Sequence, residues 1–252
     1  MKIIKAALRP FVRRVINRKR RCFSLVEDVV SNGVGLEVGG PSPIFAPSGP
    51  LPVYEYARRI NVLNYSASTF WSSFAEEGYR PAPNLEAGEQ YAFDSDGLDD
   101  LPYAAYDFLA ASHVLEHLAN PIKTLTRWVD WVRPDGAVIL VVPLKARTYD
   151  RDRPDTSLSH LIEDYLNDVG EDDRTHYAEV LRDHNLALDS TIANRRELLA
   201  RTLANRSNRI LHHHVFTPQL LKSVAELAGL EVVGDTTIYP YHIVGTFRKP
   251  CG

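Results

Sequence analysis

Histidine and carboxylate side chains are concentrated between residues 145 and 216. His160 and Asp164 are four residues apart, so they share one face of a predicted helix. His176, Glu179 and Asp183 have the spacing of one face of a second helix. An imidazole suits a general base near neutral pH, and imidazoles with carboxylates also ligate divalent metals. The candidate catalytic residues are His176, the first choice of base, with His160, His213, Asp164 and Asp173 around it.

Three interpretations of this histidine and carboxylate segment are open. In the first, it is a solvated lid whose acids face water and whose histidines belong to the core. In the second, one histidine removes the proton of an acceptor hydroxyl while a carboxylate orients it. In the third, histidines and carboxylates hold a divalent metal. Nothing in the sequence separates the second interpretation from the third.

A glycine turn offers a second kind of chemistry. A short apolar segment, residues 34–38, is followed by Gly39, Gly40, Pro41 and Ser42. Glycine lets the backbone approach a ligand closely, and the preceding Glu37 has the chemistry to bind an amine or a hydroxyl. The spacing differs from the G-x-G-x-x-G pattern of dinucleotide-binding dehydrogenases, and two prolines interrupt it, which argues against that class.

Apolar runs alternate with helical segments from residue 34 onward, which indicates a parallel sheet with crossover helices. Strands are predicted at residues 34–39, 59–63, 90–94, 106–112, 137–142, 230–238 and 242–247, and helices at 121–132, 158–169, 175–185 and 218–228. No strand is predicted within 145–210. This segment leaves the carboxyl end of a strand, where active sites of open α/β sheets lie.

Four short segments then occur in a characteristic order: residues 36–42, 94–98, 112–118 and 133–136. As a set they resemble the class I S-adenosylmethionine-dependent methyltransferases, over roughly residues 34–144. The resemblance implies a Rossmann-like, seven-stranded, mostly parallel α/β sheet, here with a helical cap insertion, and S-adenosylmethionine as cofactor. The cofactor-binding residues that it implies are Glu37, Gly39, Gly40, Ser42, Asn61, Asp94, Ser95, Ser112 and His113.

The sequence departs from the family at two of these places. Pro41 occupies the second glycine position of the turn, and Asn61 and Asn64 stand where an acid usually holds the ribose hydroxyls. An amide bonds a hydroxyl less strongly than a carboxylate does.

The later segments 160–165, 170–176 and 208–216 look like a bacterial branch found with cell-surface glycan assembly. This resemblance implies O-methylation of a sugar hydroxyl in a glycan or glycolipid, in polysaccharide biosynthesis. Aromatic residues expected in loops or at element ends, where sugar faces stack, are Tyr65, Phe70, Trp71, Tyr149 and Tyr165. Two alternatives are a catalytically inactive binding module of the same fold and a metal-dependent hydrolase that uses the histidine and carboxylate segment.

Composition places limits on these readings. The 252 residues are 44% apolar and 24% charged, which excludes collagen-like, mainly disordered and disulfide-scaffold proteins. Cys22 and Cys251 lie at opposite ends, so neither a structural disulfide nor a cysteine-ligated metal site is expected. No stretch of 18 apolar residues exists, and a cytoplasmic protein is expected.

Charge divides the chain into two parts. Residues 1–21 hold nine basic side chains and no acid, whereas the remainder holds 20 basic and 32 acidic ones. The predicted domains are a basic amphipathic helix, 1–30, and a methyltransferase domain, 31–252, with 145–210 as its substrate cap. The helix either lies on an anionic membrane surface, at the inner face of the membrane, or packs on the domain. The acidic body argues against a nucleic-acid substrate.

Overall fold

The computed structural model describes residues 22–69, 73–92 and 101–251. The basic segment 1–21 and two expected cofactor residues, Asp94 and Ser95, lie outside the described residues, as do Phe70 and Trp71.

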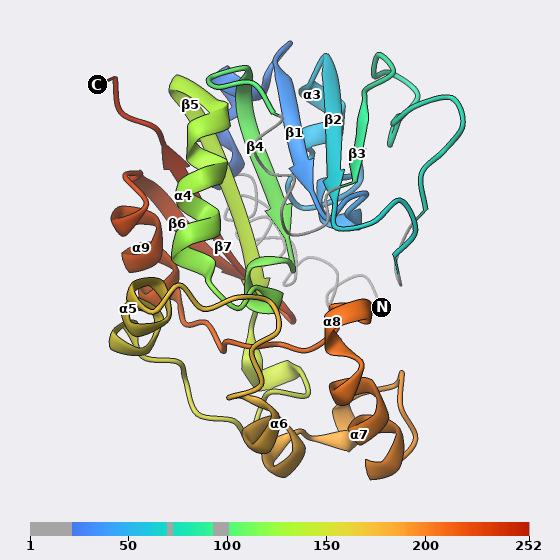
Figure 1. Cartoon of the computed structure of the whole chain (residues 1–252). Helices are drawn as coiled ribbons and strands as arrows, with labels where there is room; N and C mark the ends of the chain where they lie inside the picture. Colours follow the sequence, from blue (N-terminus) through green and yellow to red (C-terminus); the bar gives the residue numbers. More distant parts are fainter. Residues whose placement is uncertain (1–21, 70–72, 93–100, 252) are drawn as a thin grey trace, which may run out of the picture.

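Seven strands of the described chain form one sheet in the order β3-β2-β1-β4-β5-β7-β6 (Figure 1). In chain order the strands are β1 (Val34–Val38), β2 (Arg59–Asn64), β3 (Gln90–Ala92), β4 (Tyr106–Ser112), β5 (Val132–Pro143), β6 (Glu231–Ile238) and β7 (His242–Arg248). The pairs among β1 to β5 are parallel, and β7 is antiparallel to both β5 and β6. The predicted Rossmann-like, mostly parallel sheet is therefore confirmed.

The strand order reverses at β1, which pairs with β2 on one side and with β4 on the other. The chain segments that connect to β2 and to β4 cross opposite faces of the sheet. A crevice forms at the point where these two segments separate. Ligands of open α/β sheets bind at such a switch point, beyond the carboxyl ends of the strands.

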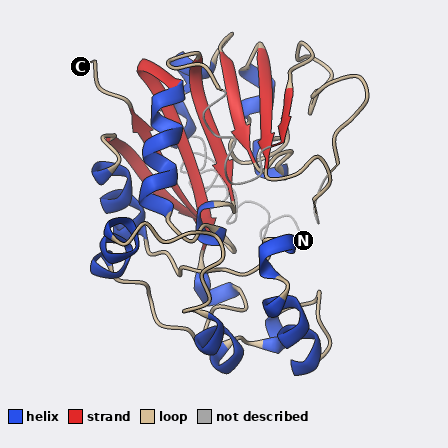
Figure 2. Ribbon diagram, viewed as in Figure 1, coloured by secondary structure: helices blue, strands red, loops and turns tan. Residues whose placement is uncertain are grey.

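Two apolar clusters hold helices on the two faces of the sheet. On one face, α4 (Pro121–Trp131) and α9 (Pro218–Leu227) pack on alternate strand residues such as Leu109 and Leu140. On the other, α2 (Glu27–Val30) and α3 (Val53–Tyr56) contact the intervening residues, including Phe108 and Ile139. Figure 2 shows the resulting three layers. Helix α4 begins where predicted because the Asn120 side chain accepts a hydrogen bond from the Lys123 amide.

The segment between β5 and α9 holds helices and no strand. These are α5 (Leu158–Leu166), α6 (Tyr177–Asp183), α7 (Arg195–Leu203) and α8 (Asn205–Asn208), and they gather beneath the arrowheads of the strands in Figure 1. Two hydrogen bonds join the ends of this insertion: Thr156 N to Val215 O at 3.0 Å and Val215 N to the Thr156 hydroxyl at 2.9 Å. Residues 157–214 thus form a segment whose two ends are held together by these hydrogen bonds.

Two further expectations concern the cysteines and membrane-spanning helices. Cys22 is buried, Cys251 is exposed, and both are free thiols. Among the described residues, no helix has both the length and the apolar character needed to cross a bilayer.

Candidate active site

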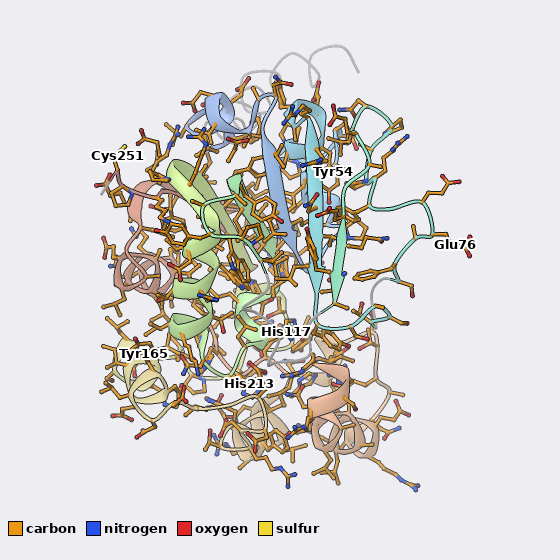
Figure 3. All side chains as sticks on the ribbon, turned by 45° about the horizontal axis from the view of Figure 1, so that its top comes forward. Tyr54, Glu76, His117, Tyr165, His213 and Cys251 are labelled. Carbon is orange, nitrogen blue, oxygen red and sulfur yellow. The ribbon has the colours of Figure 1, made fainter. Side chains whose placement is uncertain are left out.

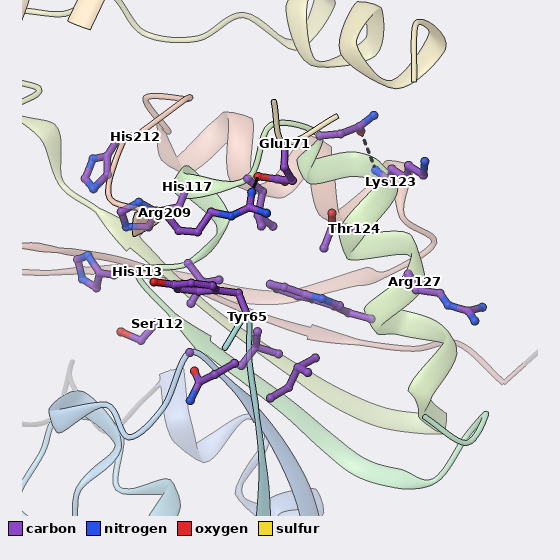
Figure 4. Close-up of a pocket in the computed structure, with 18 of the residues that line it drawn as sticks. Tyr65, Ser112, His113, His117, Lys123, Thr124, Arg127, Glu171, Arg209 and His212 are labelled. Atoms are coloured by element: carbon purple, nitrogen blue, oxygen red, sulfur yellow. Dashed lines mark hydrogen bonds and ion pairs between the residues drawn. The ribbon is translucent and has the colours of Figure 1, made fainter. Parts of the chain in front are cut away.

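A cleft of about 1250 Å³ opens between the carboxyl ends of β1, β2 and β4 and the insertion. Figure 4 shows Tyr65, Ser112 and His113 on the sheet side and Glu171 and Arg209 on the insertion side. Pockets for small ligands occupy about 300–1,000 Å³, so this one has room for a cofactor and a second molecule.

The glycine turn forms one end of the cleft. Gly39 has φ +79°, a conformation that residues with a side chain rarely adopt, and an added Cβ would collide with the Val114 side chain. Its amide donates to the Leu63 carbonyl at 2.9 Å, which joins the turn to the end of β2. Gly39, Pro41 and Ser42 line the cleft, so the proline at the second glycine position does not close it.

Glu37 does not reach the cleft, which corrects the expectation that it contacts the cofactor. Only 1% of the residue is exposed, and its carboxylate accepts hydrogen bonds from Ser42 N, the Tyr54 hydroxyl and the Tyr79 hydroxyl. Burial raises the pKa of Glu37, and the three hydrogen bonds act in the opposite sense. Gly40 packs directly over this carboxylate, where a Cβ would overlap it. Glu37 and Gly40 therefore brace the turn from behind.

Asn61 is also misplaced by the sequence prediction. Its amide nitrogen lies 3.3 Å from Glu89 Oε2 and 3.3 Å from the Tyr106 hydroxyl, and its oxygen accepts from Glu89 N, all inside the sheet. Asn64, at the carboxyl end of β2, lines the cleft instead. The strand runs three residues beyond Asn61, so only the later amide reaches the edge where ligands bind.

Ser112, the last residue of β4, and His113, which follows it, are two of the expected cofactor residues, and both line the cleft. His113 bonds His242 Nδ1 through its Nε2 at 2.9 Å, and its Nδ1 lies 3.4 Å from Glu116 Oε1. The buried Glu116 also lies 4.0 Å from the Nε2 atoms of His117 and His212. Burial raises the pKa of Glu116, but these imidazoles outweigh it and the net shift is downward.

His117 lines the cleft beside His212 (Figure 4), and Figure 3 shows its place in the whole molecule. Its Nδ1 donates to the Leu211 carbonyl at 3.1 Å. Burial, and then the nearby His212, lower the pKa of His117 to about 3, so its ring is neutral at physiological pH.

A hydrogen-bonded row of three side chains ends at the cleft wall. Because a carboxylate only accepts, His212 Nδ1 donates to Asp150 Oδ2, at 2.5 Å, and the Tyr149 hydroxyl donates to His212 Nε2 at 2.6 Å. Arg153 holds Asp150 at 2.7 Å and also donates to the His212 carbonyl at 2.9 Å. Burial raises the pKa of Asp150, but His212 and Arg153 bring it well below its usual range. Tyr149 and His212 both line the cleft.

The five predicted catalytic residues gather in one group, of which His176, His213 and Asp164 are buried, but none of them lines the cleft. His160 Nε2 lies 3.1 Å from His176 Nε2 and 3.4 Å from Asp164 Oδ2, and His213 Nδ1 lies 3.7 Å from Asp173 Oδ2. Burial, and then His213 and His160, lower the pKa of His176 to about 4.

The carboxylates expected to orient His176 bond elsewhere. Glu179 pairs with Arg153 at 2.8 Å, and Asp183 pairs with Arg182 at 2.7 Å. The position and partners of His176 thus give it no contact with a molecule in the cleft.

Sequence reasoning missed Asp150 and Arg153, gave His212 no separate role and expected Tyr149 only to stack on a sugar. Asp150 and Arg153 are three residues apart in a run of alternating charges, which is typical of a solvated ion pair, yet both are buried. Of the aromatic residues expected to stack on sugars, Tyr65, Tyr149 and Tyr165 line the cleft.

Comparison with known proteins gives one family. The model of a methyltransferase domain matches residues 17–234. No curated protein matches the chain.

Solved structures similar to this chain include three methyltransferases. Human N-acetylserotonin methyltransferase in complex with SAM is 13% identical, with a TM-score of 0.49 over 92% of this chain and 52% of that one. The 1,6-didemethyltoxoflavin-N1-methyltransferase of Burkholderia thailandensis is 13% identical, with a TM-score of 0.47 over 92% and 78%. The N-methyltransferase NodS of Bradyrhizobium japonicum WM9 is 12% identical, with a TM-score of 0.45 over 93% and 86%.

Proposed function

The chain belongs to the methyltransferase domain family and uses S-adenosylmethionine as its methyl donor, and from this premise we propose that it methylates a hydroxyl group of a sugar in a glycan or glycolipid. The observation that carries the choice of a hydroxyl is the row formed by Tyr149, His212 and Asp150 at the cleft wall.

We assign the methyl donor to the half of the cleft that lies at the switch point of the sheet, and we call it the donor half. Gly39 and Ser42 follow β1, Asn64 ends β2, and Ser112 and His113 end β4. We assign the backbone of the turn to the methionine part of the cofactor and Asn64 to its ribose hydroxyls. This arrangement leaves the space beneath the insertion for the acceptor.

The acceptor half has the surfaces that a sugar requires. Tyr65 and Tyr165 offer rings on which a sugar face stacks, whereas the Tyr149 ring is stacked on His184. Arg209 and Glu171, an ion pair at the cleft, supply donors and acceptors for hydroxyl groups. An acceptor bound between them lies beside the Tyr149 hydroxyl.

When bound, the cofactor would supply an electrophilic methyl group to the acceptor oxygen and would leave as S-adenosylhomocysteine, so the carbon–oxygen bond formed would replace the carbon–sulfur bond broken. The acceptor proton passes to the Tyr149 oxygen while the Tyr149 proton passes to His212 Nε2. Asp150 stabilises the imidazolium that results, and the barrier is lowered mainly by positioning with help from this base.

The test uses purified protein, S-adenosylmethionine and a panel of sugars, phenols, amines and carboxylates, with S-adenosylhomocysteine release as the readout. Methylation of a sugar hydroxyl is expected. His212→Gln and Tyr149→Phe are expected to lower kcat by about 10²–10⁴-fold, the usual contribution of a general base. Their affinity for S-adenosylhomocysteine is expected to stay at the wild-type value.

Tyr177→Phe is the matched control, because Tyr177 lies in the insertion but does not line the cleft. Full turnover in His212→Gln, or exclusive methylation of amines, would contradict the hydroxyl assignment. Cofactor binding with no turnover on any acceptor would instead support the inactive binding module.

A further inference from the structure

Four side chains of the insertion point their ligating atoms at one another. They are His160 and Asp164 on α5, His176 at the start of α6 and His214 just before α9, and one ligand atom from each lies within 4.8 Å of all the others. We name this set the histidine–aspartate cluster. Its members come from three segments that are distant in sequence, and none of them lines the cleft.

The spacing within the cluster fits a tetrahedral metal ion. Zinc binds imidazole nitrogen and carboxylate oxygen at about 2.0–2.2 Å, which separates neighbouring ligand atoms by about 3.3–3.6 Å in a tetrahedron. The distance from His160 Nε2 to His176 Nε2 is 3.1 Å, and that from His160 Nε2 to Asp164 Oδ2 is 3.4 Å. Asp164 Oδ2 lies 3.8 Å from His214 Nε2.

Hydrogen bonding within the protein leaves the cluster unsatisfied. Asp164 is 7% exposed, and within the described chain its Oδ2 is a buried atom without a hydrogen-bond partner. His214 Nδ1 is buried and unpartnered in the same way. His214 Nε2 lies 3.2 Å from the Ala119 carbonyl, and it would give up this hydrogen bond on binding a metal, because only an unprotonated nitrogen ligates. Burying a carboxylate oxygen without a partner is costly, and a bound cation would remove that cost.

Two neighbouring groups of similar composition offer three ligands each. They are Glu116 with His117 and His212, and Asp173 with His176 and His213. Both carboxylate oxygens of Glu116 and Nδ1 of His213 are, like Asp164 Oδ2, buried atoms without a hydrogen-bond partner in the described chain. The histidine–aspartate cluster differs from these groups in bringing four ligands together.

We propose that His160, Asp164, His176 and His214 bind one divalent transition-metal ion, with Zn²⁺ as the best fit to three imidazoles and a carboxylate. The protein fills all four positions, which is typical of a structural site and leaves no place for substrate. The ion would fasten α5 and the start of α6 to the segment before α9. It would thereby hold Gly170, Glu171 and Asp172, which line the cleft, in place.

The first measurement is the metal content of the full chain, purified without added chelator. One equivalent of zinc per chain is expected by elemental analysis. Replacement with Co²⁺ is expected to give the intense visible absorption of a tetrahedral site. A preparation with no metal above background, or a cobalt spectrum typical of octahedral coordination, would overturn the proposal.

The second measurement locates the ion. His160→Ala and Asp164→Asn are expected to bind less than one tenth of the wild-type zinc, whereas the adjacent Asp173→Asn and His213→Ala are expected to keep a full equivalent. If the first pair keeps its zinc, or the second pair loses it equally, the ion is not at this cluster.

A chelator is expected to lower the Tm of the wild-type chain, and added zinc to restore it. Because this third measurement needs no variant, it still tests the proposal if a substituted chain fails to fold. An unchanged Tm after complete removal of the metal would overturn the structural role.

Discussion

Single residues in this protein act through the backbone shapes that they permit and through the charges that they bury. Gly39 and Glu37 illustrate the two cases. Gly39 lets the turn pass close to a ligand, whereas Glu37, two residues earlier, faces away from the cleft and holds that turn.

Replacing Gly39 by valine is expected to weaken S-adenosylhomocysteine binding at least tenfold. The new side chain would meet Val114 and would force the turn out of its positive-φ conformation. Isothermal titration calorimetry measures the loss. Gly229→Val is the control, since Gly229 also has a positive φ, +84°, but no atom lies within 4 Å of an added Cβ. Equal losses in both variants would show that backbone strain alone weakens binding.

His117 is expected to make the protein sensitive to acid. Its pKa is about 3 in the folded chain and about 6.5 when unfolded, so its contribution to stability is complete above pH 6.5 and is lost as the pH falls toward 3. Between pH 7 and pH 5 this amounts to about 2 kcal/mol.

Urea denaturation of the wild type and of His117→Gln at pH 7 and pH 5 measures that contribution. The variant is expected to lose about 2 kcal/mol less over this interval. The same loss in both proteins would mean that other groups account for the acid sensitivity.

At the scale of elements, the sequence predicted the parts with strong apolar periodicity. Helix α4 and strands β4 and β5 bury almost all of their apolar residues, and their predicted bounds were confirmed within a few residues, apart from the earlier start of β5. Helix α7 was not predicted, because only Leu198 and Thr202 of its nine residues are buried and no apolar face is visible.

The site was less predictable than the sheet. Both Asn61 and Asn64 were considered from the sequence for the ribose hydroxyls, and only Asn64, at the end of β2, lines the cleft. The partners of Glu37 are tyrosines 17 and 42 residues away, which no local pattern brings together. The sequence did predict that the histidines and carboxylates of the insertion would gather, but not that they would lie behind the cleft.

Arg153 joins the insertion to the segment after β5. Its side chain is 1% exposed, and its guanidinium bonds Asp150, Glu179 and the carbonyls of His212 and His213. Arg153→Met is expected to destabilise the chain by about 3–5 kcal/mol, because Asp150 is left buried without its cation. Urea denaturation and proteolysis of the insertion measure this.

Arg182→Met is the control for that variant, since the pair of Arg182 with Asp183 is largely exposed. It is expected to leave stability unchanged. A similar loss in both variants would show that the buried network has no special role.

At the scale of the whole molecule, the distribution of charge along the chain bears on where the protein binds. Residues 1–21 carry nine basic side chains, and the rest of the chain has a net charge of −12. We propose that the basic segment attaches the protein to anionic membranes, where each basic residue contributes about 1 kcal/mol.

Sedimentation with vesicles that contain increasing amounts of anionic lipid tests this attachment. Binding is expected to rise with anionic lipid, to fall with salt and to disappear when the nine basic residues are replaced by glutamine. Turnover on a water-soluble acceptor is expected to survive that replacement. Equal binding to neutral vesicles would contradict an electrostatic attachment.

The two hydrogen bonds between Thr156 and Val215 have an evolutionary consequence. Everything between them, including all four residues of the histidine–aspartate cluster, enters and leaves the sheet at one point, whereas the donor half of the cleft is encoded before residue 114. Recombination at that point would exchange Tyr165, Glu171 and Arg209, which line the cleft, together with the histidine–aspartate cluster as one unit. Such an exchange would change the residues that face the acceptor and would leave the residues that face the methyl donor unchanged.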